Sequence, residues 1–277
     1  MGAPGKWDKW IGRTQTQFDT LTPALITRFT ATIDGSSPGN TAPQGIHWCL
    51  CLPDVATAEL DDDGHPKRGS FIPSALPPKR MWASSKVEFH TPLIVDADIE
   101  RRITFANIRE KDGASGPLIF VEINHQTFAN GTLAISERQT LVYREASAAA
   151  PIPKPADCAP NLSDWDWHST CIPSETLLFR YSALTFNTHR IHYDRPYAQE
   201  KERYRGLVVQ GPLTATLLLD LAAREIGHNQ LKHFSFRGEA PAFAGETLHL
   251  VGQKEGEAIT LAALGGDGRT VMSAQAV

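Results

Sequence analysis

The stretch from residue 211 to residue 226 reads Gly-Pro-Leu-Thr-Ala-Thr-Leu-Leu-Leu-Asp-Leu-Ala-Ala-Arg-Glu-Ile. Its proline stands at the first helical position and Gly227 stands just beyond the end, and these are the signals that begin and end an α-helix. Leu213, Leu217 and Leu221 form an i, i+4 row, and further apolar residues beside it leave little of the circumference polar. The pattern predicts a helix over residues 211–226 that a sheet must surround.

Runs of strand-like residues separated by turn signals follow this helix and also fill the first half of the chain. In the second half these runs are residues 231–238, 247–253, 258–264 and 270–276. In the first half they are residues 80–89, 96–108, 118–128 and 133–143, with turns expected at 90–92, 111–113 and 129–131 and a weaker helical candidate at 21–32. The halves therefore look like two copies of one module, each a curled antiparallel sheet around a helix, the first helix being short or degenerate. We predict an α+β fold, the double hot dog.

A small-residue, proline-rich stretch divides the chain near its midpoint. Residues 146–155 read Ala-Ser-Ala-Ala-Ala-Pro-Ile-Pro-Lys-Pro and lack any periodicity, which is typical of an extended linker. We predict an N-terminal module at residues 1–145, a linker at 146–173 and a C-terminal catalytic module at 174–277.

Composition and charge exclude several classes of protein. The chain has 277 residues, of which 41% are hydrophobic and 21% charged, values of an ordinary globular protein. A net charge of −4 supplies no basic field for a nucleic acid or an anionic membrane, and no apolar run reaches the roughly 18 residues that span a bilayer. We expect neither partner. The cysteines lack metal-site spacing and the N-terminus lacks an apolar signal segment, so we expect reduced thiols and a cytoplasmic location.

A dense group of polar residues between two apolar runs is the candidate site. Asn187, His189, His192 and Asp194 all fall within residues 187–194. One histidine in a loop is usually an ordinary polar residue, but two histidines, an amide and a carboxylate in so short a stretch favour a functional site.

The sequence around these residues resembles a known motif. Residues 182–194 read Ser-Ala-Leu-Thr-Phe-Asn-Thr-His-Arg-Ile-His-Tyr-Asp, and residues 206–214 read Gly-Leu-Val-Val-Gln-Gly-Pro-Leu-Thr. This resembles the hydratase motif T-G-D-x-N-P-x-H-x-D of the MaoC-like hot-dog family, which precedes a glycine that opens the central helix. Residues 80–83, 87–93 and 115–121 resemble the first half of two-module members that hydrate mesaconyl-CoA, itaconyl-CoA and related branched enoyl thioesters. The resemblance implies an acyl-CoA thioester substrate and no cofactor beyond its CoA. We also consider a homodimer.

Carried over residue by residue, the resemblance implies that His192 is the catalytic histidine and that Gly211 is the oxyanion-hole glycine. Asn187 occupies the position of the family's catalytic aspartate. Because an amide cannot take a proton from water, we expect Asn187 to orient the nucleophile without activating it. The side chains expected to bind substrate are His189, Arg190, Arg205, Trp82 and Arg80.

The chemistry of hydration explains why such residues are needed. Water adds hydroxide at C3 and a proton at C2 of the enoyl thioester, and negative charge builds on the thioester oxygen. A histidine with an ordinary pKa of about 6.5 suits the proton transfer expected of His192. The Gly211 N–H at a helix start suits the oxyanion, because it has no partner within the helix.

Two alternative metal sites are less well supported by their spacing. His189, His192 and Asp194 could be a metal triad, but they lack the His-Glu-x-x-His arrangement of zinc hydrolases, and we expect no metal. Residues 61–65, Asp-Asp-Asp-Gly-His, lack the alternating ligands of a calcium loop and are expected to form a solvated loop.

Three functions stay open at this point. The leading one is an enoyl-CoA hydratase for a short branched or dicarboxylic acyl group, of the mesaconyl-C4-CoA or itaconyl-CoA type, which gives citramalyl-CoA. A (3R)-hydroxyacyl-thioester dehydratase of fatty acid synthesis would use the same site in reverse. The amide at position 187 motivates the third, a catalytically weakened acyl-CoA binding protein.

Overall fold

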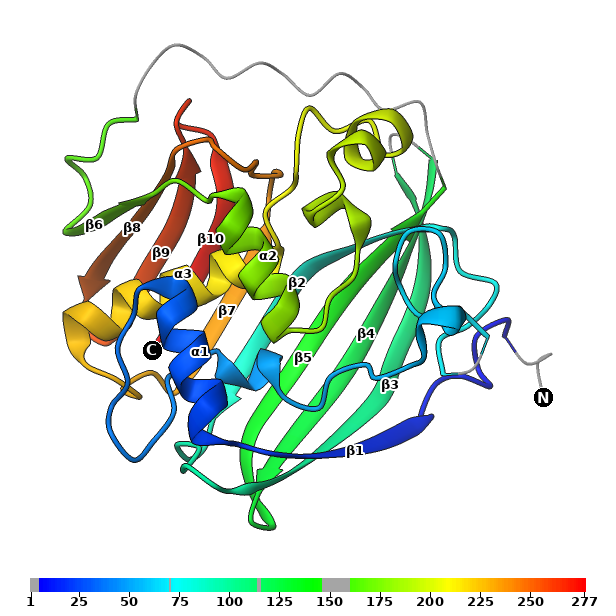
Figure 1. The fold of residues 1–277 in the computed structure, drawn as a ribbon, viewed down its shortest axis with the longest axis horizontal. Coiled ribbons are helices and arrows are strands. Elements are labelled where there is room, and N and C mark those ends of the chain that lie inside the picture. Colours follow the sequence, from blue (N-terminus) through cyan, green and yellow to red (C-terminus); the bar gives the residue numbers. More distant parts are fainter. Residues whose placement is uncertain (1–4, 70, 114–115, 146–159) are drawn as a thin grey trace.

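One ten-stranded antiparallel sheet forms the centre of the computed structural model, which describes residues 5–69, 71–113, 116–145 and 160–277 (Figure 1). The strands lie in the order β1-β3-β4-β5-β2-β7-β10-β9-β8-β6. Those of the first half are β1 (Thr14–Thr20), β2 (Lys79–Phe89), β3 (Asp98–Gly113), β4 (Gly116–Ala129) and β5 (Thr132–Arg144). Those of the second half are β6 (Trp167–Cys171), β7 (His233–Gly238), β8 (Leu248–Glu255), β9 (Ala258–Gly265) and β10 (Thr270–Ala276).

The two halves of the sheet are joined by β2 and β7. Their pairing runs from Ser84 opposite Arg237 to Glu88 opposite His233. The first residues of β2 pair only with β5, and the register shifts between Trp82 and Ser84. The halves therefore separate along the start of β2, which leaves room between them.

The predicted central helix is confirmed as α3 (Gly211–Ile226). It packs against β6, β8 and β9, and every residue from Leu213 to Ala222 is buried. The other helices are α1 (Pro23–Ile33) and α2 (Glu175–Leu184), with short helical turns η1 (Ile46–Cys49), η2 (Thr57–Glu59), η3 (Arg190–His192) and η4 (Tyr197–Lys201). None of the helices in the described ranges is long and apolar enough to cross a bilayer.

The first half has the shorter helix that the sequence predicts, and it lies to one side. α1 packs against α2 (Figure 1), with Ile26, Phe29 and Ile33 buried. Residues on one face of β3, β4 and β5 line a cavity, among them Arg101, His125 and Gln139. The first module thus offers space where the second module holds its long helix.

Several elements differ from the sequence-based expectation. The strands β1 and β6 and the helix α2 were not predicted. Residues 111–113 do not form the expected turn, because β3 continues through them and Asp112 still pairs with Pro117. Part of the proposed linker, residues 146–159, lies outside the described residues, and β6 lies within the rest of it, paired with β8.

Candidate active site

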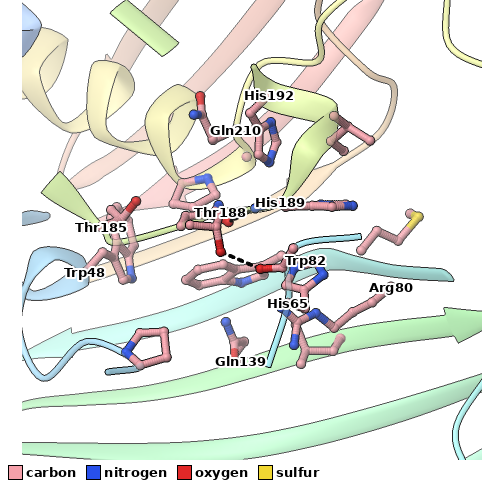
Figure 2. A pocket seen from close by; sticks show the side chains of 18 of the residues that line it. Trp48, His65, Arg80, Trp82, Gln139, Thr185, Thr188, His189, His192 and Gln210 are labelled. Carbon is pink, nitrogen blue, oxygen red and sulfur yellow. Dashed lines mark hydrogen bonds between the residues drawn. The ribbon is translucent and has the colours of Figure 1, made fainter. Parts of the chain in front are cut away.

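A cavity of about 1150 Å³ is lined by residues of both halves, and Figure 2 shows many of the side chains around it. Its walls come from the loop before β2, one face of β3, β4 and β5, the segment between α2 and α3, and the segment between β7 and β8. Its volume is slightly above the upper end of the range typical of small-molecule and cofactor sites, about 1,000 Å³. Most of the polar residues singled out from the sequence meet here.

His192 lies on η3 and is held in one orientation. Its Nδ1–H donates to the carbonyl oxygen of Val208 over 2.7 Å, so the neutral ring carries its lone pair on Nε2. Burial, only partly opposed by this hydrogen bond, lowers the pKa of His192 to about 4. The side chain is therefore a neutral base at physiological pH, with Nε2 left for a ligand.

The start of α3 is anchored beside His192. Gln210, the residue before the helix, is buried and donates from Nε2 to the Leu178 carbonyl and the Ser182 hydroxyl, each over 2.9 Å. Gly211 follows and lines the cavity. Its N–H belongs to the first turn, where backbone donors have no partner within the helix and where the helix dipole favours negative charge. Gly211 is thus placed to receive an oxyanion.

Asn187 lines the cavity and also stabilises the backbone turn before His189. Its side-chain oxygen accepts the backbone N–H of His189 over 3.0 Å, and its own N–H donates to the Ser182 carbonyl over 2.9 Å. Phe186 before it has a left-handed φ of 48°, which turns the chain sharply. The amide therefore holds the turn that presents His189 and leaves its NH₂ group for a ligand.

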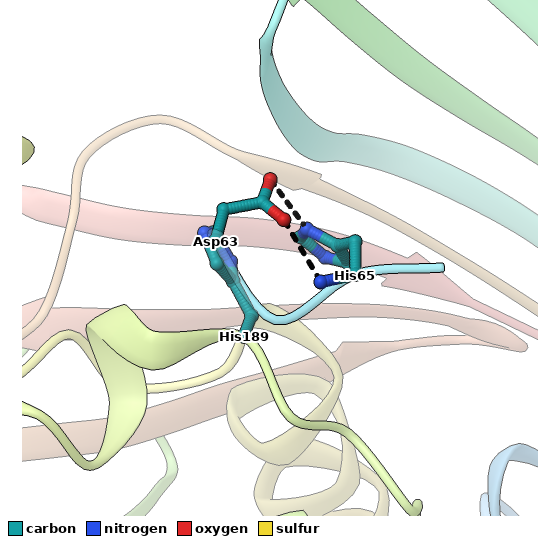
Figure 3. Close-up of side chains that lie close together, drawn as sticks. All are labelled: Asp63, His65 and His189. Carbon is teal, nitrogen blue, oxygen red and sulfur yellow. Dashed lines mark hydrogen bonds and ion pairs between the residues drawn. The ribbon is translucent and has the colours of Figure 1, made fainter. Parts of the chain in front are cut away.

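Asp63 and His65 lie close to His189, although the sequence analysis expected residues 61–65 to form a solvated loop (Figure 3). One oxygen of Asp63 accepts the backbone N–H of His65 over 2.8 Å, and the other lies 3.0 Å from Nδ1 of the same residue. The ring of His65 lies 4.2 Å from that of His189, which in turn lies 5.4 Å from that of His192. Burial, followed by the two neighbouring imidazoles, lowers the pKa of His189, so this residue is neutral too.

The loop of residues 61–65 is docked, and the expectation of a solvated loop is wrong. A Cβ atom at Gly64 would lie 1.8 Å from the Thr188 carbonyl oxygen, and Gly64 also has a left-handed φ of 89°, so only glycine permits this approach. The Arg190 backbone N–H donates to the Asp63 carbonyl over 2.9 Å. A pattern of acidic residues followed by glycine gave no sign of this contact.

The ligand atoms of Asp63, His65 and His189 all lie within 4.8 Å of one another, a spacing that could hold a metal ion. The triad weighed from the sequence is different, because Asp194 turns to other partners. Its carboxylate accepts from the Arg190 guanidinium over 2.7 and 3.0 Å and from the Tyr197 N–H over 3.0 Å. Asp194 thus lies before η4 and holds its first residue in place through the Tyr197 N–H.

The expected substrate-binding residues fall into two groups. Trp82 and Arg80 of β2 line the cavity together with His189, and Figure 2 shows all three around the same space. Arg190 and Arg205 lie outside the lining. Arg190 pairs with Asp194, while Arg205 pairs with Glu246 and stacks 4.1 Å over the ring of Phe243. The structure does not bring these two arginines to the site.

Comparison with known proteins adds an independent line of support. The family model "Hydroxyacyl-thioester dehydratase type 2" matches residues 45–244. A mesaconyl-C(4)-CoA hydratase from Chloroflexus aurantiacus is 43% identical over 272 residues, covering 97% of this chain and 96% of the relative. A MaoC-like dehydratase from Phytophthora capsici has a TM-score of 0.70 at 14% identity, covering 96% of this chain and 95% of that one. A Mycobacterium tuberculosis protein with a double hotdog fold has a TM-score of 0.62 at 14% identity, with the same coverage. These likenesses confirm the predicted double hot dog.

Proposed function

Because the chain belongs to the hydroxyacyl-thioester dehydratase type 2 family, we propose that it hydrates a short enoyl-CoA that carries a second carboxylate, of the mesaconyl-C4-CoA or itaconyl-CoA type. The identity of 43% to a mesaconyl-C(4)-CoA hydratase supports this class of substrate. One structural observation carries the proposal. His192 donates Nδ1–H to Val208 and keeps Nε2 free at a cavity that the helix start of Gly211 also lines.

In the proposed reaction His192 handles the proton of the attacking water. Its Nε2 accepts a proton as the water oxygen bonds to C3, and the Val208 carbonyl stabilises the imidazolium through Nδ1–H. The same proton is then available for C2, so that the elements of one water molecule are added in total. General acid–base catalysis of this kind contributes roughly 10²- to 10⁴-fold to a rate.

Gly211 supplies the second requirement, a donor for the thioester oxygen. When oxygen bonds to C3, the electron pair of the double bond moves through C2 towards that oxygen, which becomes an enolate. The Gly211 N–H and the dipole of α3 stabilise this charge. Pro212 has no N–H to share the task. Asn187 holds the turn of His189, and its NH₂ group is available to orient water.

The dehydratase reading uses the same residues in reverse, and the description of the family model favours keeping it as the second candidate. The third candidate function, an acyl-CoA binding protein, is motivated by Asn187 at the position of the family's catalytic aspartate. The oriented, neutral His192 argues against it, because a base is present without that acid. A cytoplasmic location, a homodimer and the absence of any cofactor beyond the CoA of the substrate stay predictions.

A panel of enoyl-CoA thioesters tests the proposal. Mesaconyl-C4-CoA, itaconyl-CoA and crotonyl-CoA are each incubated with the protein, and the loss of the unsaturated thioester and the gain of its hydrated product are followed by liquid chromatography. We expect the fastest loss with one of the two dicarboxylic thioesters. Preference for crotonyl-CoA or longer chains would favour the dehydratase of fatty acid synthesis. Binding without turnover of any thioester would leave only the acyl-CoA binding protein.

A further inference from the structure

Two arginines that line the cavity differ in how their guanidinium groups are used. Arg101 of β3 is 8% exposed, and its N–H groups donate to the carbonyl oxygens of His47 and of Leu50, the latter over 3.0 Å. Arg80 of β2 is half-buried, and its guanidinium has no hydrogen-bond or ion-pair partner among the described residues. A planar guanidinium beside a ligand cavity, with no acceptor among the residues that the structure describes, is suited to binding an anion.

Arg80 lies at the point where the two halves of the sheet separate. It pairs with Tyr143 of β5, four residues before β2 meets β7 at Ser84. Figure 2 shows its side chain beside His65 at the cavity. Its positive charge is one cause, after burial, of the lowered pKa of His65, and it also contributes to the lowered pKa of His189. The guanidinium is therefore close to the histidines of the site.

The acidic groups near Arg80 are already engaged. Both carboxylate oxygens of Asp63 face His65. Glu202 pairs with Lys79 and accepts the Tyr197 hydroxyl over 3.3 Å. Since His65 and His189 are neutral, the charge of Arg80 is left without a direct counter-ion in this part of the described cavity.

Building on the proposed function, we propose that Arg80 binds the free carboxylate of the substrate and so selects dicarboxylic enoyl-CoA thioesters. In the mesaconyl-C4 group this carboxylate is attached to C3, the carbon that receives water. A residue that holds it must therefore lie near the histidines that act on that water, as Arg80 does. A bidentate guanidinium–carboxylate pair would also fix the orientation of C3.

The competing explanation is a contact between Arg80 and a phosphate of CoA, which all acyl-CoA thioesters share. Succinyl-CoA and butyryl-CoA separate the two explanations, because they have acyl chains of the same length and both lack the reactive double bond. Only succinyl-CoA carries a carboxylate on C3. Their dissociation constants are measured by calorimetry for the parent protein, Arg80→Met and Arg80→Lys.

We expect the parent protein to bind succinyl-CoA more tightly than butyryl-CoA, and Arg80→Met to weaken succinyl-CoA alone by about 10- to 100-fold, the range of a hydrogen-bonded charge pair. Arg80→Lys keeps the positive charge without the planar guanidinium, so its dissociation constant for succinyl-CoA should lie between those of the parent and Arg80→Met. With mesaconyl-C4-CoA and crotonyl-CoA as substrates, Arg80→Met should lower kcat/KM for the first only. Because the Arg80 guanidinium has no hydrogen-bond or ion-pair partner in the described part of the chain, these variants should keep the parent's melting temperature.

Arg203→Met is the matched control, since Arg203 also lines the cavity but is not among the causes of the shifted histidine pKa values. It should change succinyl-CoA and butyryl-CoA binding by the same factor. An equal loss for both thioesters in Arg80→Met would assign Arg80 to CoA and overturn the proposal, as would equal binding of both by the parent. A parent protein that binds both but hydrates no enoyl-CoA would refute the proposed function instead.

Discussion

Two buried polar groups lie in the same molecule, and they differ in whether their members satisfy one another. The closed cluster consists of Arg101, Glu137, Trp48 and Ser85. Arg101 donates to the backbone carbonyls of His47 in η1 and of Leu50 just after it. Glu137 accepts from the Trp48 ring N–H over 3.2 Å and from the Ser85 hydroxyl. Although burial opposes it, the neighbouring imidazoles of His47 and His125, together with the Ser85 hydroxyl, hold the pKa of Glu137 at about 2.

The open cluster consists of His192, His189, His65, Asp63 and Arg80. Here Nε2 of His192, the ring of His189 and the guanidinium of Arg80 face the cavity without a partner among the described residues. Buried polar groups in proteins are normally hydrogen-bonded, so unused ones mark places where a ligand completes the set. We infer from this difference that the closed cluster supports the wall of the cavity and that the open cluster binds the ligand and acts on it.

The largest expected effect comes from removing the base of the open cluster. His192→Ala should lower kcat by about 10²- to 10⁴-fold while KM changes little, because general acid–base catalysis is lost and the cavity stays. Steady-state hydration of the best thioester in the panel measures both constants. The control is His233→Ala, an exposed histidine of β7. Near-normal turnover by His192→Ala would contradict the assignment and make His189 the next suspect.

A substitution in the closed cluster should lower the stability of the protein. Arg101→Met removes the donors that hold the carbonyls of His47 and Leu50 and leaves Glu137 with one cation fewer, so the free energy of unfolding should fall by about 3 kcal/mol. Urea unfolding measures it. The neighbouring Arg102 has an exposed side chain on the opposite face of β3, and Arg102→Met should stay within about 0.5 kcal/mol of the parent. An equal fall in the free energy of unfolding for both variants would show that the hydrogen bonds of Arg101 do not stabilise the closed cluster.

Substitutions of Asn187, which supports His189 of the open cluster, should lower activity according to the hydrogen bonds that they remove. Asn187→Ala loses the acceptor for the His189 N–H, and kcat should fall by about 10- to 100-fold as the turn loosens. Asn187→Asp keeps an acceptor oxygen and should retain more activity. Its new carboxylate should also raise the pKa of the nearby imidazoles and shift the acid limb of the pH–rate profile upward. A parental profile for Asn187→Asp, together with full activity of Asn187→Ala, would show that the residue is silent.

One buried neutral histidine, His192, belongs to the open cluster, and another, His125, lies near Glu137 of the closed cluster; both should make stability depend on pH. Burial lowers the pKa of His192 and of His125 to about 4, from an ordinary value of 6.5. Between these values the unfolded chain binds more protons than the folded one, so the stability present above pH 6.5 is lost as the pH falls towards 4. The slope is up to about 1.4 kcal/mol per pH unit for each histidine.

Urea unfolding of the parent and of His125→Phe at pH 6.5 and pH 4.5 checks this expectation. The variant should lose less stability between the two pH values than the parent does. Identical losses would mean that His125 does not remain neutral in the folded protein.

The smallest expected effect concerns metal. Asp63, His65 and His189 have a spacing that could hold an ion, but the carboxylate of Asp63 already accepts from His65, and the proposed reaction uses no metal. Dialysis against EDTA should change hydratase activity by less than about 2-fold, with zinc or magnesium added back as the comparison. A large loss of activity that is reversed by adding a metal would indicate that the open cluster acts through a bound metal ion and not through acid–base catalysis alone.

Features with local causes could be predicted from the sequence. The helix α3 begins and ends where its proline and glycine predict, and the long strands β4 and β5 agree with their β-branched and aromatic runs to within two residues at each end. The polar stretch containing His189 and His192 was found because several functional side chains lie close together along the chain. Two missed elements lacked such signals. β1 is polar except for Phe18 and nearly all exposed, and β6 is only five residues long.

The α+β class, the central helix and the candidate base His192 follow from the order of residues alone, because capping, periodicity and motif spacing act over a few residues. Which side chains surround that base depends instead on contacts between segments that are far apart in the chain. Asp63 and His65 reach His189 from more than a hundred positions away, through a close approach that Gly64 permits. Packing between distant segments also decided that Arg101 is bonded within the fold while Arg80 faces the cavity. Two arginines are chemically identical in a sequence, and their surroundings alone make one structural and leave the other for a ligand.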